Sequence, residues 1–476
     1  MSWLGRLSRQ VSGYAVGVIG RQVIVFVAIP LFTHGMTQAE YGIVALTASL
    51  VAFTNTVSNL GLPAATFRYY NEYESEAERQ EVLGAGCLLA AGYALLAALV
   101  LTVLREPLQK RLLHSAPPGL VFLLAAFIVV EGTAQYGYVI LRAQTRYAVY
   151  SSIVIGHAIV QVSIAAVLVY RYKLGVVGYW LGYLCGSFVA VMALVVMTRE
   201  SISLGGIHGK VVRLTRFGVP LVLSALSLWS LGLVDRWLLS VIQGPSTVAS
   251  YEVAYKIGAL VGFVMVPFRV AWPQFGFGSM KERDARHLYA TAATILACAA
   301  GCVALVVVGT SPLIGEILAP ASYGSVDGIV AWVALGQVAW VLFPVLSIGI
   351  KIEERPQLVS LAALVAATCN VALNVLLIPR MGAEGAAIAT TVGYGVLAVG
   401  VTYGSIVVYS IQIEWSKVCA ALGITSALVA LLTVSAGEVS TGWSIVLRTV
   451  TVVIGVLLLG TLLMSRVREV RVGREV

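Results

Sequence analysis

The chain has 476 residues, of which 59% are hydrophobic and 11% charged, and its mean hydropathy is +0.92. A soluble protein of this length does not need so much apolar surface. The net charge of +9 belongs mostly to short loops between apolar runs, which argues against nucleic-acid binding. The composition therefore predicts an all-α integral membrane protein.

Apolar runs of spanning length follow one another along the whole chain, separated by hydrophilic stretches too short for a soluble domain. A bilayer-spanning helix needs about 20 apolar residues. We predict about 14 spans, at residues 11–33, 42–64, 83–104, 119–141, 147–170, 174–197, 217–242, 252–275, 288–309, 325–350, 357–379, 384–408, 418–435 and 442–464.

Two segments far apart in the chain resemble each other. TQAEYGIVALTASL at residues 37–50 aligns with TVASYEVAYKIGAL at residues 247–260, so that Tyr41 matches Tyr251, 210 positions later. A second pair of matching segments has nearly the same offset: LGVVG contains Gly175 and MGAEG contains Gly382, 207 positions later. A steady offset indicates a tandem repeat.

The repeat divides the predicted spans into two halves. We expect an N-terminal lobe of six spans in residues 1–200 and a C-terminal lobe of six spans in residues 201–410. The last two spans and a basic tail occupy residues 411–476. Because each half has an even number of spans, both share one orientation across the membrane, and a carrier with its path between the lobes is expected.

Lysine and arginine set the orientation. With the N-terminus in the cytoplasm, inside loops and tails carry 20 of the 31 basic residues and outside loops carry 6. Arg105, Lys110 and Arg111 in one outer loop are the exception. We therefore expect both termini in the cytoplasm. No cleavable signal peptide is expected, because no cleavage site follows an early apolar run.

Several charged residues fall inside predicted spans, where each costs about 2.5–3.5 kcal/mol or more unless it faces water or a partner. The cations outnumber the acids, so an anionic partner or a hydrated cavity is expected. The alternative for Asp235 is that it neutralises Lys256 or a neighbouring arginine. The cations are Arg21, Arg236, Lys256, Arg269 and Arg448, and the acids are Glu131, Asp235 and Glu252. We expect Arg448, near a span end, to snorkel to the interface.

Polar residues also recur at i, i+4, which places both members of a pair on one helical face. These stripes fit a hydrated lumen, and hydrogen bonding between helices is the alternative. For His157, simple packing is the alternative to a titrating role. The pairs are Asn55 and Asn59, Glu131 and Gln135, His157 and Gln161, and Asn370 and Asn374.

Motifs of common enzymes are missing. The chain contains no GxxxxGK[ST], HExxH, CxxC or nucleophile elbow, so we expect neither catalysis nor ATP hydrolysis. Its six cysteines all fall in predicted spans, where we expect them to pack as small apolar residues. No cofactor and no metal site are expected.

Five fragments together resemble the polysaccharide transporter family, the Wzx-type flippases of lipid-linked oligosaccharides: MTQAEYG, DRWLL, SYEVAYKIGAL, AWPQF and NVLLIPRMGAEGAAIAT. That family belongs to the superfamily of lipid II flippases and multidrug extruders. The resemblance implies two six-helix lobes around a central cavity that opens alternately to each side. It also implies a monomer in the bacterial inner membrane.

The resemblance further implies a cargo and its binding residues. The cargo would be undecaprenyl-pyrophosphate-linked oligosaccharide, moved from the cytoplasmic to the outer leaflet. Arg21 and the Asp235–Arg236 pair match positions of cavity charges in the family, and Lys256 matches less distinctively. The last two spans resemble the lipid-tail groove of lipid II flippases. Polysaccharide polymerase and assembly proteins are expected partners.

The candidate substrate-binding residues are Arg21, Asp235, Arg236, Lys256, Arg269, Asn55, Asn59 and Asn374, and the candidates for ion coupling are Glu131 and Asp235. Physical chemistry agrees, since arginine complements a pyrophosphate by bidentate hydrogen bonding. Three alternatives stay open: a lipid II flippase, a drug or cation antiporter of the same superfamily, and a non-transporting scaffold of polysaccharide assembly.

Overall fold

A computed structural model describes residues 3–113, 116–219, 222–265, 268, 272, 276, 280, 285–324, 326–438 and 441–475. Every regular element within these ranges is helical, which confirms the predicted fold class. The chain forms two compact units. Unit 1 comprises Met1–Trp229 and Gly244–Ala249, and unit 2 comprises Ser230–Gln243 and Ser250–Val476. The predicted lobe boundaries at residues 200 and 410 stay predictions.

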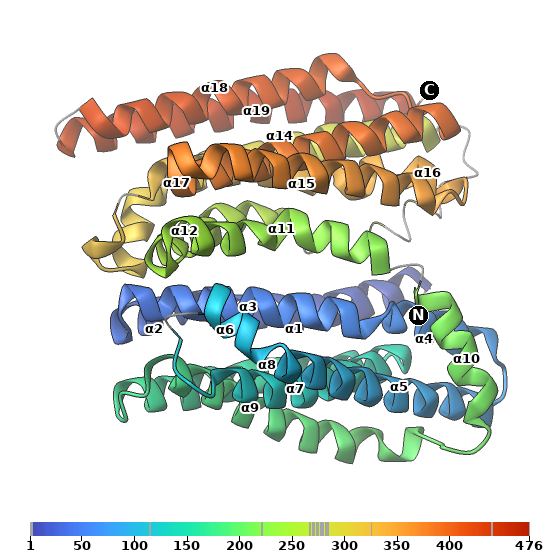
Figure 1. The fold of residues 1–476 in the computed structure, drawn as a ribbon. Coiled ribbons are helices and arrows are strands. Elements are labelled where there is room, and N and C mark those ends of the chain that lie inside the picture. Colours follow the sequence, from blue (N-terminus) through green and yellow to red (C-terminus); the bar gives the residue numbers. More distant parts are fainter. Residues whose placement is uncertain are drawn as a thin grey trace. The chain divides into compact units, whose positions relative to one another are not determined.

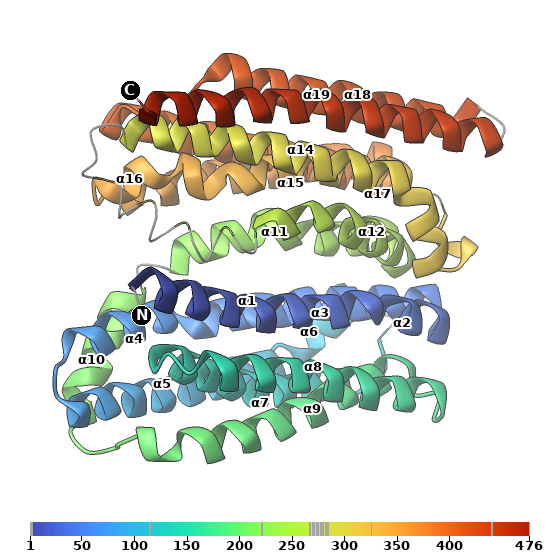
Figure 2. The same ribbon diagram turned by 180° about the vertical axis from the view of Figure 1, so that it is seen from behind.

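Unit 1 is a bundle of long helices with short connecting helices (Figures 1 and 2). Its elements are α1 (Trp3–Val27), α2 (Ile29–Gly35), α3 (Gln38–Asn59), α4 (Leu62–Glu72), α5 (Glu76–Val103), α6 (Arg105–Arg111), α7 (Leu120–Ala143), α8 (Tyr147–Tyr170), α9 (Gly175–Thr198), η1 (Arg199–Ser201) and α10 (Ile207–Gly218). Helix α7 packs against α5 and α9, and α8 packs against α1 and α9.

The first repeated motif starts α3. The Thr37 side chain accepts a hydrogen bond from the backbone N–H of Glu40 at 3.3 Å, and the Glu40 carboxylate accepts one from the backbone N–H of Thr37 at 2.9 Å. This reciprocal cap satisfies donors that a helix start leaves open. Glu40 also lies over Gly175, where a methyl group would collide with its carboxylate. The two repeated motifs therefore meet within unit 1.

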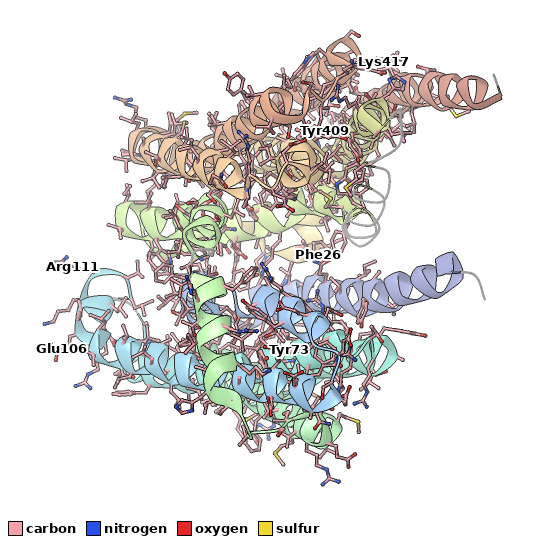
Figure 3. All side chains as sticks on the ribbon, turned by 90° about the vertical axis from the view of Figure 1, so that its right-hand side faces the viewer. Phe26, Tyr73, Glu106, Arg111, Tyr409 and Lys417 are labelled. Carbon is pink, nitrogen blue, oxygen red and sulfur yellow. The ribbon has the colours of Figure 1, made fainter. Side chains whose placement is uncertain are left out.

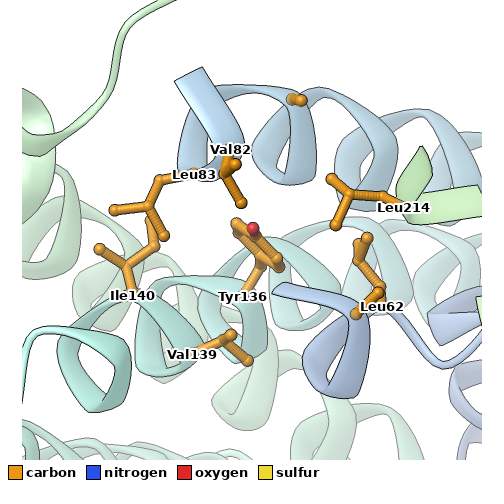
Figure 4. Close-up of a cluster of buried hydrophobic side chains, with 9 residues drawn as sticks. Leu62, Val82, Leu83, Tyr136, Val139, Ile140 and Leu214 are labelled. Atoms are coloured by element: carbon orange, nitrogen blue, oxygen red, sulfur yellow. The ribbon is translucent and has the colours of Figure 1, made fainter. Parts of the chain in front are cut away.

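A cluster of buried hydrophobic side chains joins α4, α5, α7 and α10 (Figure 4). Tyr136 of α7 lies at its centre, and its hydroxyl is 3.0 Å from that of Thr66. Leu214 brings α10 into the same cluster. Burying one such side chain contributes about 1.5–3 kcal/mol, so this cluster fixes α10 to unit 1.

Unit 2 begins within α11 (Val222–Gln243) and α12 (Pro245–Gly258). It continues with η3 (Ala259–Val264), α14 (Ala285–Leu318), η4 (Ala321–Tyr323), α15 (Asp327–Leu346), α16 (Ile348–Ile352), α17 (Pro356–Tyr409), α18 (Trp415–Glu438) and α19 (Thr441–Glu475). Helices α18 and α19 pack on α14 (Figure 2).

Helix α17 is a hairpin of two helices rather than one rod. Its backbone leaves the helical conformation at Gly382, where φ is 59°. The arms run antiparallel: Gly385 lies against Leu377, and Gly400 lies against Ala362. The second repeated motif lies at a turn of the chain in both units, since Gly175, the first residue of α9, has φ 50°.

Twelve described helices are long and apolar enough to cross a membrane, so the predicted number of 14 is not confirmed. Two of the predicted spans, 357–379 and 384–408, are the arms of α17. The predicted span at 252–275 falls on α12, η3 and residues partly outside the described ranges. The remaining predicted spans each overlap one of these helices.

Arg448 does not snorkel, and that expectation is wrong. Its side chain on α19 is 7% exposed, and Nη2 lies 3.5 Å from Oδ2 of Asp327 on α15. Nη1 donates to the carbonyl of Val308 on α14 at 3.3 Å. An arginine near a span end becomes buried when a carboxylate is within reach, because leaving that charge unpaired in lipid costs more. This contact ties α19 to α14 and α15.

Candidate functional site

Unit 2 holds a group of buried charges, the aspartate–arginine cluster, formed by Asp235, Arg236, Tyr251 and Glu252. Asp235 and Arg236 are neighbours on α11, and each is 1% exposed. Arg236 Nη1 lies 2.8 Å from Asp235 Oδ1, and Arg236 Nη2 lies 3.1 Å from Glu252 Oε2 on α12. Tyr251 donates its hydroxyl hydrogen to the other Asp235 oxygen.

The guanidinium of Arg236 is surrounded by partners. Besides both carboxylates it donates to the Gly232 carbonyl at 2.7 Å, and the Tyr255 ring lies 4.1 Å from its central carbon. Lys256 adds a second cation, with Nζ 3.5 Å from Glu252 Oε1. Asp235 is thus neutralised by the adjacent Arg236, which agrees with the alternative that Asp235 pairs with a neighbouring cation. In this conformation an anion could reach Arg236 only by displacing a carboxylate.

The second arm of α17 contributes to the same region. Thr390 donates to Asp235 Oδ2 at 3.2 Å, and the hydroxyls of Tyr394 and Tyr255 are 3.3 Å apart. Asn370 Nδ2 donates to Thr390 Oγ1 at 3.4 Å, and Asn374 Nδ2 donates to the Asn370 carbonyl at 2.9 Å. The bonds of Thr390 and Tyr394 hold the hairpin against α11 and α12, and the bond of Asn370 joins its two arms.

The two asparagines retain free acceptors. Asn370 and Asn374 are completely buried, and neither Oδ1 atom accepts a hydrogen bond from a described residue. A buried carbonyl without a donor costs about 1–3 kcal/mol. An acceptor without a donor is consistent with substrate binding by Asn374, which stays a prediction.

Unit 1 holds a second buried group, the glutamate–histidine network, formed by Glu131, Gln135, Tyr138, His157, Gln161 and Ser187. Glu131 of α7 is 4% exposed. Its two carboxylate oxygens accept hydrogen bonds from Gln135 at 2.6 Å and from Ser187 of α9 at 2.7 Å.

His157 of α8 completes this network and is also 4% exposed. Its Nδ1 lies 2.9 Å from the Tyr138 hydroxyl, and its Nε2 lies 3.1 Å from Ser187 Oγ. The same Nε2 is 3.7 Å from Glu131 Oε2. The sequence pairs at i, i+4 thus mark four members on α7 and α8, while Tyr138 of α7 and Ser187 of α9 join them outside those pairs.

Arg21 on α1 differs from Arg236, because it is half-buried and makes no hydrogen bond or ion pair with a described residue. Its charge acts electrostatically on Tyr138 and His157. Asn55 and Asn59 on α3 are half-buried, and their side chains make no hydrogen bond within the described ranges. Arg269 lies outside the described residues.

Among the described residues of the predicted spans, cations do not outnumber acids. The cations are Arg21, Arg236, Lys256 and Arg448, and the acids are Glu131, Asp235, Glu252, Asp327 and Glu384. The expected surplus of positive charge was overestimated because Asp327, at the start of α15, and Glu384, in α17, were not counted. Within the described part of the chain no three His, Cys, Asp or Glu side chains form a group able to hold a metal ion.

Sequence reasoning missed Tyr251, Ser187 and Thr390. Each joins a polar pair from another helix, so no spacing within one helix could reveal it. One feature of the sequence singled out Tyr251: it aligns with Tyr41 in the repeated motif.

The structure is similar to the lipid II flippase MurJ in an inward closed conformation, with a TM-score of 0.71 at 12% identity over 94% of this chain and 98% of that one. It is also similar to an inward-facing multidrug-resistance MATE transporter of the MOP superfamily, with a TM-score of 0.63 at 15% identity over 84% and 95%.

A third structural match is a MOP-superfamily transporter from Pyrococcus furiosus, described as having a binding pocket of reverse polarity. Its TM-score is 0.54 at 14% identity, over 87% of this chain and 96% of that one. A sequence comparison with curated proteins gives no match.

The fold defines the class: an all-helical, multi-pass membrane protein whose fold is similar to that of MOP-superfamily transporters. Within that class the family is shown by sequence, because the model of the family "Polysaccharide biosynthesis protein" matches residues 7–276. The chain belongs to this family.

Proposed function

We propose that the protein is a flippase for undecaprenyl-pyrophosphate-linked oligosaccharide. It moves this lipid from the cytoplasmic to the outer leaflet of the bacterial inner membrane by alternating access. The observation that carries the proposal is membership in the polysaccharide biosynthesis family on a fold similar to that of the lipid II flippase MurJ. No catalytic step is required of the protein.

The pyrophosphate headgroup is the part of the cargo that the charged residues can recognise. A diphosphate carries about two negative charges and accepts bidentate hydrogen bonds from arginine. Arg21 suits this role because its guanidinium makes no hydrogen bond or ion pair with the described residues. Arg236 and Lys256 would contribute by exchanging a carboxylate for the headgroup. Asn55, Asn59 and Asn374 offer polar contacts to sugar hydroxyls, and Arg269 remains a further candidate.

The membrane potential can drive this transport. An inside-negative potential favours outward movement of negative charge by about 2.3 kcal/mol per charge for each 100 mV. A pyrophosphate crossing the whole field gains roughly twice that. The polyprenyl tail stays in the lipid while the headgroup crosses. The transport halves would be residues 1–200 and 201–410, and residues 411–476 would accompany the tail.

Flipping in reconstituted vesicles tests this proposal. Purified protein is placed in liposomes that contain fluorescent undecaprenyl-pyrophosphate oligosaccharide, lipid II or a cationic dye. We expect potential-dependent movement of the oligosaccharide lipid. Preferential movement of lipid II would favour the lipid II flippase instead, and movement of the dye alone would favour the antiporter that the similarity to MATE transporters suggests. A folded protein that moves none of them would support the scaffold.

A further inference from the structure

The hydrogen bonds of Ser187 determine which ring nitrogen of His157 carries a hydrogen. A serine hydroxyl has one hydrogen to donate and two acceptor positions. Ser187 donates its hydrogen to Glu131 at 2.7 Å and accepts one from Gln161 at 2.9 Å. The 3.1 Å contact with His157 Nε2 can then be a hydrogen bond only if Nε2 carries a hydrogen and donates it.

The other ring nitrogen of His157 is consequently the atom that can gain or lose a proton. In the neutral ring, Nδ1 accepts the Tyr138 hydroxyl hydrogen at 2.9 Å. In the protonated ring, Nδ1 donates to the same oxygen, and only the Tyr138 hydroxyl hydrogen has to turn. The network can therefore take up one proton without moving a heavy atom.

Charged or titratable side chains of three helices, α1, α7 and α8, surround this ring. Burial opposes the protonated form of the ring most, and Arg21 on α1 opposes it as well, whereas Glu131 on α7, 3.7 Å away, stabilises it. Tyr138 on α7 contacts the ring, and Tyr150 on α8 packs against Tyr138 with ring centroids 5.7 Å apart.

The remaining partners of the network carry no charge. They are Ser187, the amide of Gln161, and the Tyr183 carbonyl, which accepts from Gln161 at 3.4 Å. In the unprotonated network the charge of Glu131 offsets that of Arg21. One added proton leaves a net positive charge beside Arg21.

We propose that His157 and Glu131 form a proton-binding site that links the binding of an anionic headgroup near Arg21 to the uptake of a proton. The inference rests on the proposed function. An anion near Arg21 compensates the charge that the proton adds, so each ligand increases the affinity for the other. By linkage the effect is reciprocal.

The test measures the affinity of the full-length protein in nanodiscs for undecaprenyl pyrophosphate at about pH 6 and about pH 8, either side of the range in which an ordinary histidine titrates. The wild type should bind more tightly at the lower pH, by up to about tenfold per pH unit for one linked proton. His157→Gln and Glu131→Gln should both flatten this dependence. Any titration of the ligand itself is common to all variants and cancels in the comparison.

Trp180→Phe is the matched control. It removes another buried hydrogen bond of unit 1, from Trp180 Nε1 to Thr47 Oγ1 at 2.8 Å, and leaves Glu131 and His157 in place. It should keep the pH dependence of the wild type. Glu131→Gln keeps the test decisive if His157→Gln fails to fold.

The outcomes separate the two proposals. Tight binding with the same pH dependence in wild type, His157→Gln and Glu131→Gln overturns the proton site and leaves the flippase standing. Failure of folded wild-type protein to bind the pyrophosphate lipid at either pH overturns both.

Discussion

Two arginines inside predicted spans have opposite surroundings. Arg236 is completely buried and bonded to Asp235, Glu252 and a backbone carbonyl. Arg21 is half-buried, with no hydrogen bond or ion pair to a described residue. A charge that is already paired stabilises its own fold, whereas a charge without a partner is free to meet a ligand. We therefore expect Arg21 to act in binding and Arg236 to act first in stability.

Replacing Arg21 should weaken headgroup binding without unfolding the protein. A hydrogen bond to a charged group contributes about 1.5–3 kcal/mol, so Arg21→Ala should raise the Kd for undecaprenyl pyrophosphate roughly 10- to 150-fold. Arg21→Lys should recover part of the loss, because it keeps the charge but not the bidentate geometry. Unchanged affinity in Arg21→Ala would remove Arg21 from the binding site.

Replacing Arg236 should destabilise the protein strongly. Arg236→Ala leaves the buried Asp235 without its cation and leaves Glu252 with Lys256 alone. Removing one partner of a buried ion pair costs about 3–5 kcal/mol. Thermal unfolding in detergent measures the loss. The control is Arg199→Ala, whose side chain is 70% exposed and whose contact with Glu200 is 3.8 Å long, for which we expect about 0–1 kcal/mol. Equal Tm values for the two variants would contradict the role of the aspartate–arginine cluster.

For single residues, the sequence predicted which side chains share a helical face better than it predicted their hydrogen-bonding partners on other helices. The i, i+4 spacing correctly put Glu131 and Gln135 on one face, and they are hydrogen-bonded at 2.6 Å. It could not predict that Ser187 or Tyr251 would complete the networks, because both contacts join different helices. It also missed the ion pair of Arg448 with Asp327 for this reason.

Among the elements, α10 is held to unit 1 by charge as well as by apolar packing. Lys210 Nζ lies 3.2 Å from Glu78 and 3.8 Å from Glu81, and 3.5 Å from the centre of the Tyr73 ring. Tyr73 lies beside α10 in Figure 3, and its hydroxyl accepts from Arg213 at 2.7 Å. Burial opposes the charge of Lys210, but hydrogen bonds to Tyr73 and Glu78 outweigh it and raise the pKa of Lys210.

A raised pKa gives the docking of α10 a defined pH dependence. The contribution of Lys210 is complete below the ordinary lysine pKa of 10.5 and is lost only as the pH rises through the raised value. We therefore expect α10 to stay docked from neutral pH to about pH 10. Lys210→Met should loosen it already at neutral pH. Spin-label distances between α10 and α5 measure this.

Lys110→Met is the control for that experiment, since the Lys110 side chain is 78% exposed and its contact with Glu106 is 3.8 Å long. Identical α10–α5 distances in wild type and Lys210→Met at neutral pH would show that apolar packing alone holds the helix.

The turn of the α17 hairpin depends on Gly382. Its φ of 59° is costly for other residues, and an added methyl group would meet the Gln243 side chain at 2.9 Å. Gly382→Ala should therefore cost about 1–2 kcal/mol. Gly395→Ala in the same helix meets no atom within 4 Å and should be neutral or stabilising. A Tm of Gly382→Ala at or above that of Gly395→Ala would contradict this.

The sequence predicted this hairpin only in part. The predicted spans 357–379 and 384–408 match its two arms. The motifs LGVVG and MGAEG were matched as parts of a repeat, and the structure adds that both of their first glycines have positive φ. The short helices α4, α6 and α10 were not foreseen, because they lie between spans where apolar content gives no periodic signal of spanning length. In α10 a strongly amphipathic pattern was present, since Leu214 is buried while Val212 and Arg213 are exposed.

For the whole molecule, composition was sufficient to predict the all-helical membrane class. The number of spans was harder to confirm. Two predicted spans are the arms of the single element α17, and the predicted span at 252–275 lies partly outside the described residues. Charge balance was hardest, since Asp327 and Arg448 neutralise each other across helices that lie far apart in the chain. The fold class can be predicted from the overall composition, whereas a binding site depends on individual side-chain contacts between helices.

The central claim is that the protein flips a pyrophosphate-linked glycan with the help of Arg21. It is tested most directly by leaflet-resolved detection of undecaprenyl-pyrophosphate oligosaccharide in cells carrying wild-type protein, a deletion, or Arg21→Ala. We predict accumulation on the inner leaflet in both mutants, with Arg21→Ala still inserted in the membrane. A normal leaflet distribution in both mutants would contradict the claim.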